Sequence, residues 1–485
     1  MRVLGSDIAN DDQNASTVFS AARRPKERLF AWAALGLYLA LGIVLALHHE
    51  AWRDEADTWL IARDAPLSDL PRLLGRAGTP ALWYAILIPF ARAGAPYATQ
   101  AVVHLVIASS AAALLFLYAP FPRLLKLLIA FSFYMGYEYL AIARPYALSV
   151  FLLFALAARY PRRLAQPLRF ALLFALLVNS TVHALMIGLA IGPVVALEMI
   201  TRRVERRWIA IAIMAAGGAF AALPILLAGS HAVVSPLRHI DPRAALSAVA
   251  AAFAPGSNPV AAVLGLAVFF AASASVARDR HVLVILWLSW TALLFIYVLV
   301  YRGTLRHFGF LFVAVVFALW IAAGGEPPRW ARTALIVTLS ASLVLSTAFA
   351  MSAWRLEMRY PFSGAKDAAA FLRSHHLEGR PIAAHPPAAS EAVLAYLPPR
   401  RFWYPAEGRA GSYMRWDASF WTFNAMSPDA VMDRALAHVA RGSDLLILSN
   451  APLAIAPKYG LRLLYTTKGP VFGRPDERYV IYGWK

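Results

Sequence analysis

The chain has 485 residues, of which 60% are hydrophobic and only 15% are charged. Soluble domains are roughly half apolar and about a quarter charged, so this composition excludes an ordinary soluble protein. The net charge of +19 comes without a basic-aromatic binding module, so we expect no nucleic-acid partner, and the absence of cysteine excludes disulfides and thiol chemistry.

Long apolar segments follow one another through the first 352 residues. A helix that crosses a membrane needs roughly 17 to 25 apolar residues, and a chain in lipid must be helical because its backbone groups have to bond internally. We expect about eleven crossings, near residues 29–47, 98–118, 124–140, 142–158, 168–182, 184–200, 208–228, 259–277, 281–300, 307–323 and 332–352. The sequence predicts a polytopic α-helical membrane protein, with residues 29–352 as its membrane domain.

Basic residues indicate the orientation of these crossings. Residues 1–28 are polar, end in RRPKER and precede no clear cleavage site, so we expect an uncleaved cytoplasmic segment. Every second turn between crossings is then basic, as the positive-inside rule predicts for a bacterial inner membrane. The apolar stretch 79–92 is short for a span, and counting it as one would reverse this pattern. We therefore expect it to lie in the interface, within a first outer loop at 48–97.

From residue 353 to the C-terminus polar residues return and apolar runs shorten. The pattern predicts a soluble α/β domain outside the cell membrane, in the periplasm or its equivalent. Helices are expected at 364–375, 388–397 and from Pro428 to just before Gly442, and strands at 381–385, 444–450, 461–467 and 477–483, with part of the sheet parallel. The aromatic run Phe402–Tyr404 suits either stacking on sugar rings or a buried strand.

The first outer loop is unusually acidic. Six of the 27 acids of the chain fall within twenty residues, namely Glu50, Asp54, Glu55, Asp57, Asp64 and Asp69. Solubility alone explains many acidic loops, but the apolar segments that follow hold this loop against the bilayer. Asp54 and Glu55 are adjacent and so point apart. We expect one to face a reacting centre and the other to anchor the loop.

Two further clusters lie at outer ends of predicted spans. In YEYLAIARPYAL, Tyr137 and Glu138 precede Arg144, and an ionisable residue in a span indicates function, although a simple Glu138–Arg144 pair is an equal alternative. In YRGTLRHFGF, Arg302, Arg306 and His307 are three potential cations that suit a lipid phosphate, although arginines also snorkel to fix helix depth. No spacing of histidines indicates a metal site, but the acids could hold a divalent cation.

The stretch WRDEADTWLIARDAPL…GTPALWYAIL, followed by YEYLAIARPYALSVFLL, resembles the GT-C class of membrane glycosyltransferases. Protein O-mannosyltransferases and the lipid A aminoarabinose transferase belong to this class. The resemblance covers the first 160 residues best and extends loosely to LRHFGFLF. It matches Asp54 to the catalytic acid, Glu55 to its neighbour and Glu138 to an acid of the second outer loop. Many relatives carry Pro-Pro where this chain has GTPAL, which favours Arg302 and Arg306 as the phosphate contact.

The resemblance implies a polyprenyl-phosphate sugar as donor and a glycan, lipid or protein as acceptor on the outer face. Asp54 would take the proton of the acceptor hydroxyl, and direct attack would invert the anomeric centre. Asp54 and Glu138 suit the positive charge that develops on the sugar, and the arginines suit the phosphate. A transporter or flippase of a lipid-linked sugar, or a non-catalytic assembly protein, remains an alternative.

Overall fold

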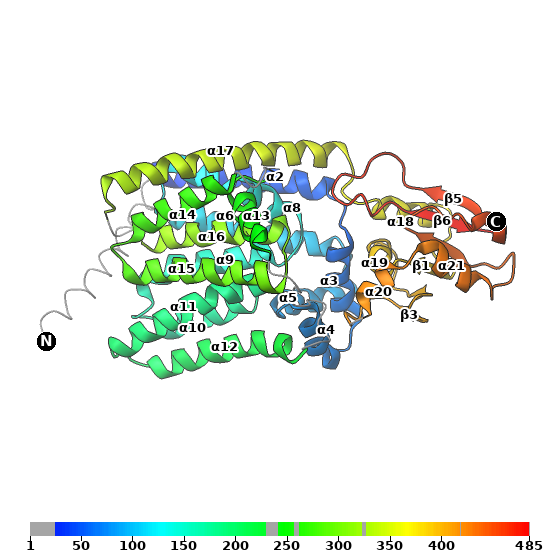
Figure 1. The fold of residues 1–485 in the computed structure, drawn as a ribbon, viewed down its shortest axis with the longest axis horizontal. Coiled ribbons are helices and arrows are strands. Elements are labelled where there is room, and N and C mark those ends of the chain that lie inside the picture. The colour runs from blue at the N-terminus through cyan, green and yellow to red at the C-terminus, as the bar shows by residue number, and fades with distance from the viewer. Residues whose placement is uncertain (1–24, 229–240, 257–260, 323–325, 418, 485) are drawn as a thin grey trace, which may run out of the picture.

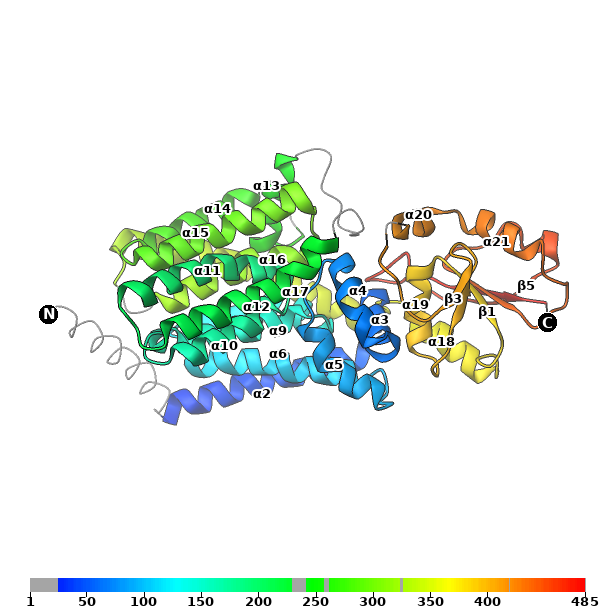
Figure 2. The same cartoon turned by 90° about the horizontal axis from the view of Figure 1, so that it is seen from below.

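The computed structural model describes residues 25–228, 241–256, 261–322, 326–417 and 419–484. A bundle of long helices fills one half of the molecule, and a mixed α/β region that includes the C-terminus is stacked on one end of it (Figures 1 and 2). Residues 1–24, with the basic pair Arg23 and Arg24, lie outside the described residues. So do residues 229–240, which follow the crossing expected near 208–228.

Among the residues that the structure describes, six helices are long and apolar enough to cross a membrane, and a bent pair makes a seventh candidate. The six are α2 (Pro25–His48), α6 (Thr99–Tyr118), α11 (Val182–Thr201), α12 (Arg207–Ala228), α15 with its π-helical end η6 (Arg280–Val300), and α17 (Arg329–Arg359). In the pair, α7 (Arg123–Ala130) meets a π-helical turn η2 (Tyr134–Glu138) and α8 (Tyr139–Ala141) at 56°. The expected multi-pass helical membrane protein is therefore confirmed.

Shorter helices pack among these spans. They are α9 (Tyr146–Arg159), α10 (Pro167–Val178), α14 (Ala262–Val276) and α16 (Leu305–Ile321). The stretch between the crossings expected near 208–228 and 259–277 contains a further helix, α13 (Pro242–Phe253). Asp241 caps it, because its side chain accepts a hydrogen bond from the backbone N–H of Arg243.

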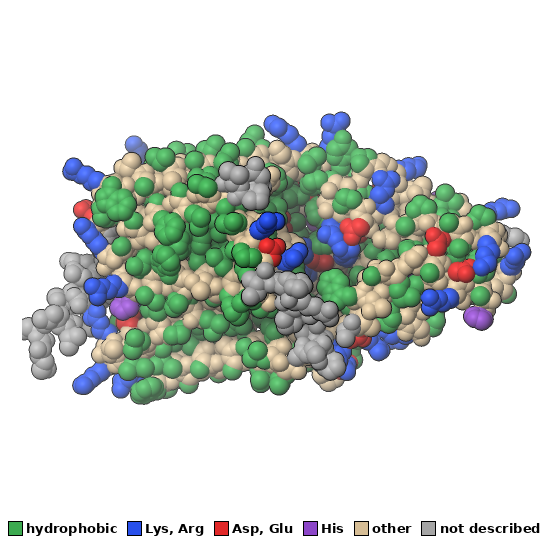
Figure 3. Space-filling model, in the orientation of Figure 1, with side chains coloured by type: hydrophobic (Ala, Val, Ile, Leu, Met, Phe, Trp, Pro, Cys, Tyr) green, Lys and Arg blue, Asp and Glu red, His purple; other side chains and the backbone are tan. Residues whose placement is uncertain are grey.

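The turns predicted to be cytoplasmic share one end of the bundle, here called the basic end. Three contacts join these turns in pairs. Arg123 at the start of α7 pairs with Glu27 of α2, Arg163 before α10 pairs with Glu198 near the end of α11, and Arg278 donates to the carbonyl of Glu326 before α17. Figure 3 shows Lys and Arg side chains gathered at this end, opposite the α/β region.

The opposite end, here called the domain-facing end, carries the segment between α2 and α6. This segment folds as α3 (Arg53–Asp64), the short turn η1 (Leu67–Asp69), α4 (Leu70–Ala77) and α5 (Leu82–Arg92). Gly78 ends α4 in the left-handed conformation that favours glycine, with φ of 67°. Gly75 lies so close to the Pro224 carbonyl of α12 that any side chain would clash, which fixes α4 against the bundle.

The C-terminal region contains a six-stranded mixed sheet in the order β3-β2-β1-β4-β6-β5. β1 pairs in parallel with β2 and β4, and the other pairs are antiparallel, so the expectation of a partly parallel sheet is confirmed. The strands are β1 (Ile382–His385), β2 (Phe402–Tyr404), β3 (Arg409–Gly411), β4 (Leu446–Ser449), β5 (Arg462–Thr466) and β6 (Val480–Gly483). Phe402 and Tyr404 are buried in β2, as the strand alternative predicted.

Helices cover both faces of this sheet. They are α18 (Ala365–Ser374), α19 (Pro387–Ala395), α20 (Phe420–Ala425), α21 (Pro428–Leu436) and the short η7 (Ala456–Tyr459). α21 ends six residues before Gly442, earlier than expected. Ala56 and Leu60 of α3 belong to the same buried cluster as α18, α19 and the inner strands. The segment between α2 and α6 therefore shares a core with the C-terminal region.

Candidate functional site

Asp54 lies in the first turn of α3 and meets a residue that is 252 positions away in the chain. Its Oδ2 accepts a hydrogen bond from Nη2 of Arg306 at 2.8 Å, and Arg306 stands in the first turn of α16. The guanidinium of Arg306 also lies over the ring of Trp52, with Cζ 4.9 Å from the ring centroid. The side chains of Asp54 and Arg306 remain 22% and 17% exposed, so solvent still reaches this pair.

Arg144 contacts the same turn of α3 from another direction. Its guanidinium donates hydrogen bonds to the backbone carbonyl of Asp54 and, at 3.0 Å, to the hydroxyl of Thr58. Among the described residues, the Nε–H of Arg144 and the Nε–H of Arg306 are buried without a hydrogen-bond partner. Two arginines therefore converge on Asp54, and each keeps one donor that an oxygen of a ligand can satisfy.

His307, the neighbour of Arg306, is held as a neutral imidazole. Its Nδ1 accepts the backbone N–H of Thr304 at 2.8 Å, so this nitrogen carries a lone pair and the ring proton is on Nε2. Nε2 lies 2.9 Å from the hydroxyl of Tyr146 and therefore donates to it. The proton of the Tyr146 hydroxyl has no recorded acceptor among the described residues. The Tyr146 hydroxyl, which is within electrostatic range of Arg306, can therefore donate a hydrogen bond to a ligand.

The remaining member of the predicted cationic cluster lies elsewhere. Arg302 is 65% exposed, and its nearest carboxylate is that of Asp241 at 3.9 Å. The structure therefore does not bring together Arg302, Arg306 and His307 as three cations. Of these three residues, only Arg306 places its positive charge against Asp54. This ion pair differs from the arrangement of a snorkelling arginine, which keeps its charged end in water.

Glu138 and Tyr137 occupy the π-helical turn at the bend of the α7–α8 pair. Such turns are rare and occur often at functional sites. Glu138 is buried and within electrostatic range of Arg306, while Arg144 makes its contacts with α3, so the expected alternative of a Glu138–Arg144 pair is not seen in the described residues. The Tyr137 hydroxyl donates to Oε2 of Glu357 in α17 at 2.5 Å.

Glu55 has surroundings unlike those of Asp54. Its side chain is 1% exposed; Oε1 accepts the backbone N–H of Ala143, and Oε2 accepts the backbone N–H of Trp52 and a ring N–H of His49. The other ring nitrogen of His49 lies 2.9 Å from Oε1 of Glu357. Both ring nitrogens of His49 thus face carboxylates. The segment 49–55 is thereby tied to α17 and to the chain before α9.

Charges in this network stabilise one another. Burial by itself lowers the pKa of His49. The charges and hydrogen bonds of Glu55 and Glu357 together have a larger effect than burial, and they hold the pKa of His49 well above its ordinary value. Burial raises the pKa of Glu55, but His49 and two backbone N–H groups bring it below the ordinary value. Glu55 is therefore ionised and fully hydrogen-bonded. His49 and Glu357 were not anticipated from the sequence because both sit at the ends of apolar runs.

No family model, curated protein or solved structure matches the chain. In the part of the chain that the structure describes, no three His, Asp or Glu side chains are grouped so as to hold a metal ion. The functional argument therefore rests on the geometry around Asp54.

Proposed function

We propose that the chain is an inverting membrane glycosyltransferase of the GT-C kind, using a polyprenyl-phosphate-linked sugar as donor. The observation that carries this proposal is Asp54, a partly exposed carboxylate held by Arg306 and approached by Arg144, each arginine with an unpartnered N–H. A base next to unused phosphate donors is the arrangement that transfer from a phosphate-linked sugar requires.

The proposed topology places this site on the outer face of a bacterial inner membrane. The six long helices and the bent pair account for seven crossings, and α9, α10, α14 and α16 would supply four more, which gives the eleven expected from the sequence. The basic end would face the cytoplasm by the positive-inside rule. The C-terminal α/β region, and the Asp54 site beneath it, would then face the periplasm.

In the proposed reaction the phosphate of the donor binds to Arg306 and Arg144. This frees the carboxylate of Asp54, which accepts the proton of the acceptor hydroxyl as its oxygen bonds to the anomeric carbon. The bond between that carbon and the phosphate oxygen breaks, and its electron pair leaves with the phosphate. Tyr146 donates a hydrogen bond to the leaving oxygen, and the buried Glu138 stabilises positive charge on the sugar. Glu55 positions α3 and does not take part in the proton transfer.

A groove in the bundle suits the lipid chain of such a donor. It encloses about 640 Å³ between α10, α11 and α12, with almost wholly apolar walls. It follows α11 from Val182 to Ala196, which is roughly 20 Å of helix. Val182 precedes His183, whose ring stacks on His307 with centroids 4.9 Å apart. The groove therefore begins near the proposed phosphate site and runs toward the basic end.

Two glycines allow a matched test of the groove. A Cβ at Gly218 of α12, which lines the groove, or at Gly36 of α2, which does not, would meet no atom within 4 Å. Gly218→Leu should raise the KM for a long-chain donor several-fold and leave a donor with a short, water-soluble chain unaffected. Gly36→Leu should change neither. Equal effects of both substitutions would remove the groove from the proposal.

The decisive assay uses the purified full-length chain in nanodiscs, with a radiolabelled polyprenyl-phosphate sugar and a lipid extract as the acceptor source. If the chain transfers the sugar, the labelled donor should be consumed and a new labelled glycoside should form. A flippase would move the intact donor between leaflets, and an assembly protein would leave it unchanged. Intact donor after prolonged incubation with acceptor mixtures of lipid, glycan and protein would overturn the proposed function.

A further inference from the structure

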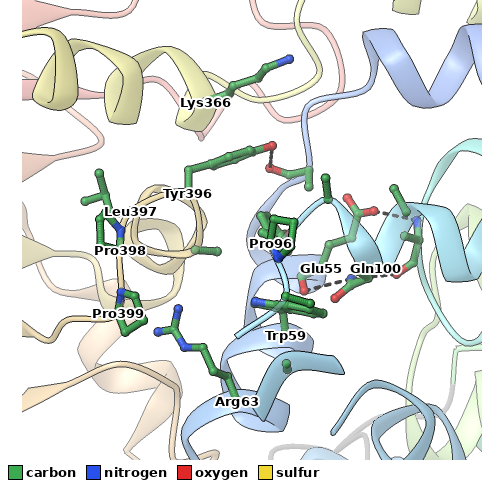
Figure 4. Close-up of a pocket in the computed structure, with 18 of the residues that line it drawn as sticks. Glu55, Trp59, Arg63, Pro96, Gln100, Lys366, Tyr396, Leu397, Pro398 and Pro399 are labelled. Carbon is green, nitrogen blue, oxygen red and sulfur yellow. Dashed lines mark hydrogen bonds between the residues drawn. The ribbon is translucent and has the colours of Figure 1, made fainter. Parts of the chain in front are cut away.

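A second cavity lies on the other side of α3, between the helical bundle and the C-terminal region. It encloses about 760 Å³, which is within the range of sites for small ligands. Figure 4 shows Trp59, Arg63 and Glu55 projecting from α3 on one side, with Lys366 and Tyr396 of the C-terminal region on the other. Asp54 and Arg306 are not among its lining residues, so it is distinct from the site proposed above.

The charge of this cavity favours an anion. Five basic side chains line it, and two acids oppose them; the lining charges are those of His49, Arg63, Arg92, Lys366, Arg373, Glu55 and Asp64. Both acids are already engaged, Asp64 with Arg63 and Glu55 with His49. Lys366 is exposed and forms no ion pair with another described residue, and Glu50 lies within its electrostatic range. The basic side chains of the wall outnumber its acids, so the cavity carries a net positive charge.

Gln100 provides an independent sign of a ligand. Its side chain is 2% exposed, and its amide nitrogen donates to the carbonyls of Glu55 and Ala143, both at 3.1 Å. Because both partners are acceptors, the amide cannot be turned round, and its Oε1 is left buried without a donor among the described residues. The hydroxyl of Tyr97, also in the wall, is likewise without a partner there. A ligand that carries hydroxyl groups would satisfy both.

The position of the cavity indicates where that ligand comes from. The turn from Gly94 to Ala98, between α5 and α6, forms part of the wall, as do Ala46 near the end of α2 and Ala101 in the first turn of α6. These residues mark the level at which apolar helices give way to the polar region. Lipid headgroups lie at this level of a bilayer.

From these observations we infer that the cavity binds the headgroup of an anionic, hydroxyl-bearing membrane lipid. Its phosphate would face Lys366, and its hydroxyls would face Gln100 and Tyr97. The inference does not depend on the proposed glycosyl transfer, because it concerns binding at a cavity whose lining does not include Asp54, Arg144 or Arg306.

Native mass spectrometry of the full-length chain can count bound lipids directly. Phosphatidylglycerol, which has a phosphate and two hydroxyls, should bind more tightly than phosphatidic acid, which has no such hydroxyls, and far more tightly than zwitterionic phosphatidylcholine. Glycerol phosphate should compete if the headgroup alone is recognised. Indistinguishable affinities for the three lipids would overturn the inference.

Variants locate the binding. Lys366→Glu should weaken binding of phosphatidylglycerol by roughly five-fold or more, as expected for a basic residue beside an anionic headgroup. Ala98→Trp, at an exposed lining position, should weaken it by filling space. Lys468→Glu, an exposed position outside the cavity, is the matched control. Equal effects of Lys366→Glu and Lys468→Glu would contradict the site. Lipid binding that persists without any donor turnover would instead refute only the proposed function.

Discussion

Asp54 and Glu55 are neighbours in the first turn of α3, but the two sides of this helix have different surroundings. Asp54 is partly exposed and held by an arginine from α16. Glu55 is buried, accepts hydrogen bonds from three groups and, through His49, is linked to Glu357 of α17. Under the proposed function, Asp54 would take part in the chemistry and Glu55 would hold the start of α3 in place. The predictions below test this difference and the contacts around it.

The largest expected difference concerns stability. Glu55→Ala removes the partner of a buried cationic histidine and of two backbone N–H groups, so we expect a loss of about 3 to 5 kcal/mol in the free energy of unfolding. Asp54→Ala breaks a partly exposed pair and should cost about 1 kcal/mol or less. Unfolding titrations in mixed micelles measure both. Similar losses for the two variants would show that α3 has no such division of roles.

The second prediction concerns the charge of Arg306. Arg306→Met keeps an apolar stem against Trp52 but removes the guanidinium, so transfer should fall by roughly 10² to 10³ in kcat/KM. Arg302→Met, four positions earlier and largely exposed, is the control and should behave like the wild type. A larger defect in Arg302→Met would place the phosphate elsewhere.

The third prediction concerns Tyr146. Tyr146→Phe keeps the ring and removes the hydroxyl that His307 orients, so kcat should fall by about 10-fold to 100-fold, the effect of one hydrogen bond to a charged group. Tyr134→Phe is the control, because the Tyr134 hydroxyl donates to the carbonyl of Ala251 outside the site. Steady-state kinetics with a saturating donor distinguish the two. An unchanged kcat in Tyr146→Phe would exclude the proposed donor.

The last prediction concerns the dependence of stability on pH at the contact of α3 with the C-terminal region. Burial raises the pKa of Asp57 from 3.8 to about 7, against the charge of Arg144 and the hydrogen bonds from Trp416. The nearby Glu391 is also buried, and burial together with Asp57 raises its pKa well above the ordinary value. A raised carboxyl pKa means that the folded state binds protons more strongly than the unfolded state. Stability should therefore fall as pH rises from about 4 to about 7.

Thermal unfolding at several pH values tests this effect. The wild-type melting temperature should be higher at pH 5 than at pH 8. Asp57→Asn keeps an acceptor for Trp416 but cannot ionise, so the difference between the two pH values should shrink. A pH dependence that is unchanged in Asp57→Asn would assign the effect to other groups.

That the chain crosses a membrane several times was predictable from the sequence, because long apolar runs are bounded by basic or polar residues. Of the eleven expected crossings, six helices and one bent pair among the described residues are long and apolar enough to span. The sequence predicted only that Asp54, Arg144 and Arg306 lie at the same end of the bundle. Their contacts depend on how α3 and α16 pack, which no local pattern encodes. The resemblance to GT-C enzymes matched Asp54 to the catalytic acid and Glu55 to its neighbour, but it gave no contacts for either side chain.

Other features could not be predicted from local sequence patterns. Glu357 lies 308 residues from His49 and follows an apolar run, so it resembled the polar end of a span. The neutral state of His307 depends on one backbone N–H, that of Thr304, which the sequence does not reveal. Helix α13 is short and alanine-rich, and no long apolar run marks it in the sequence. In each case the deciding factor was a long-range contact or a local backbone geometry.

The central claim is that the carboxylate of residue 54 takes the proton of the acceptor. Single-turnover assays of purified wild-type and Asp54→Asn protein, each preloaded with the same labelled donor, test this most directly. We expect the variant to bind the donor and to form the glycoside roughly 10² to 10⁴ times more slowly. Glycoside formation by Asp54→Asn at a rate close to that of the wild type would contradict the account.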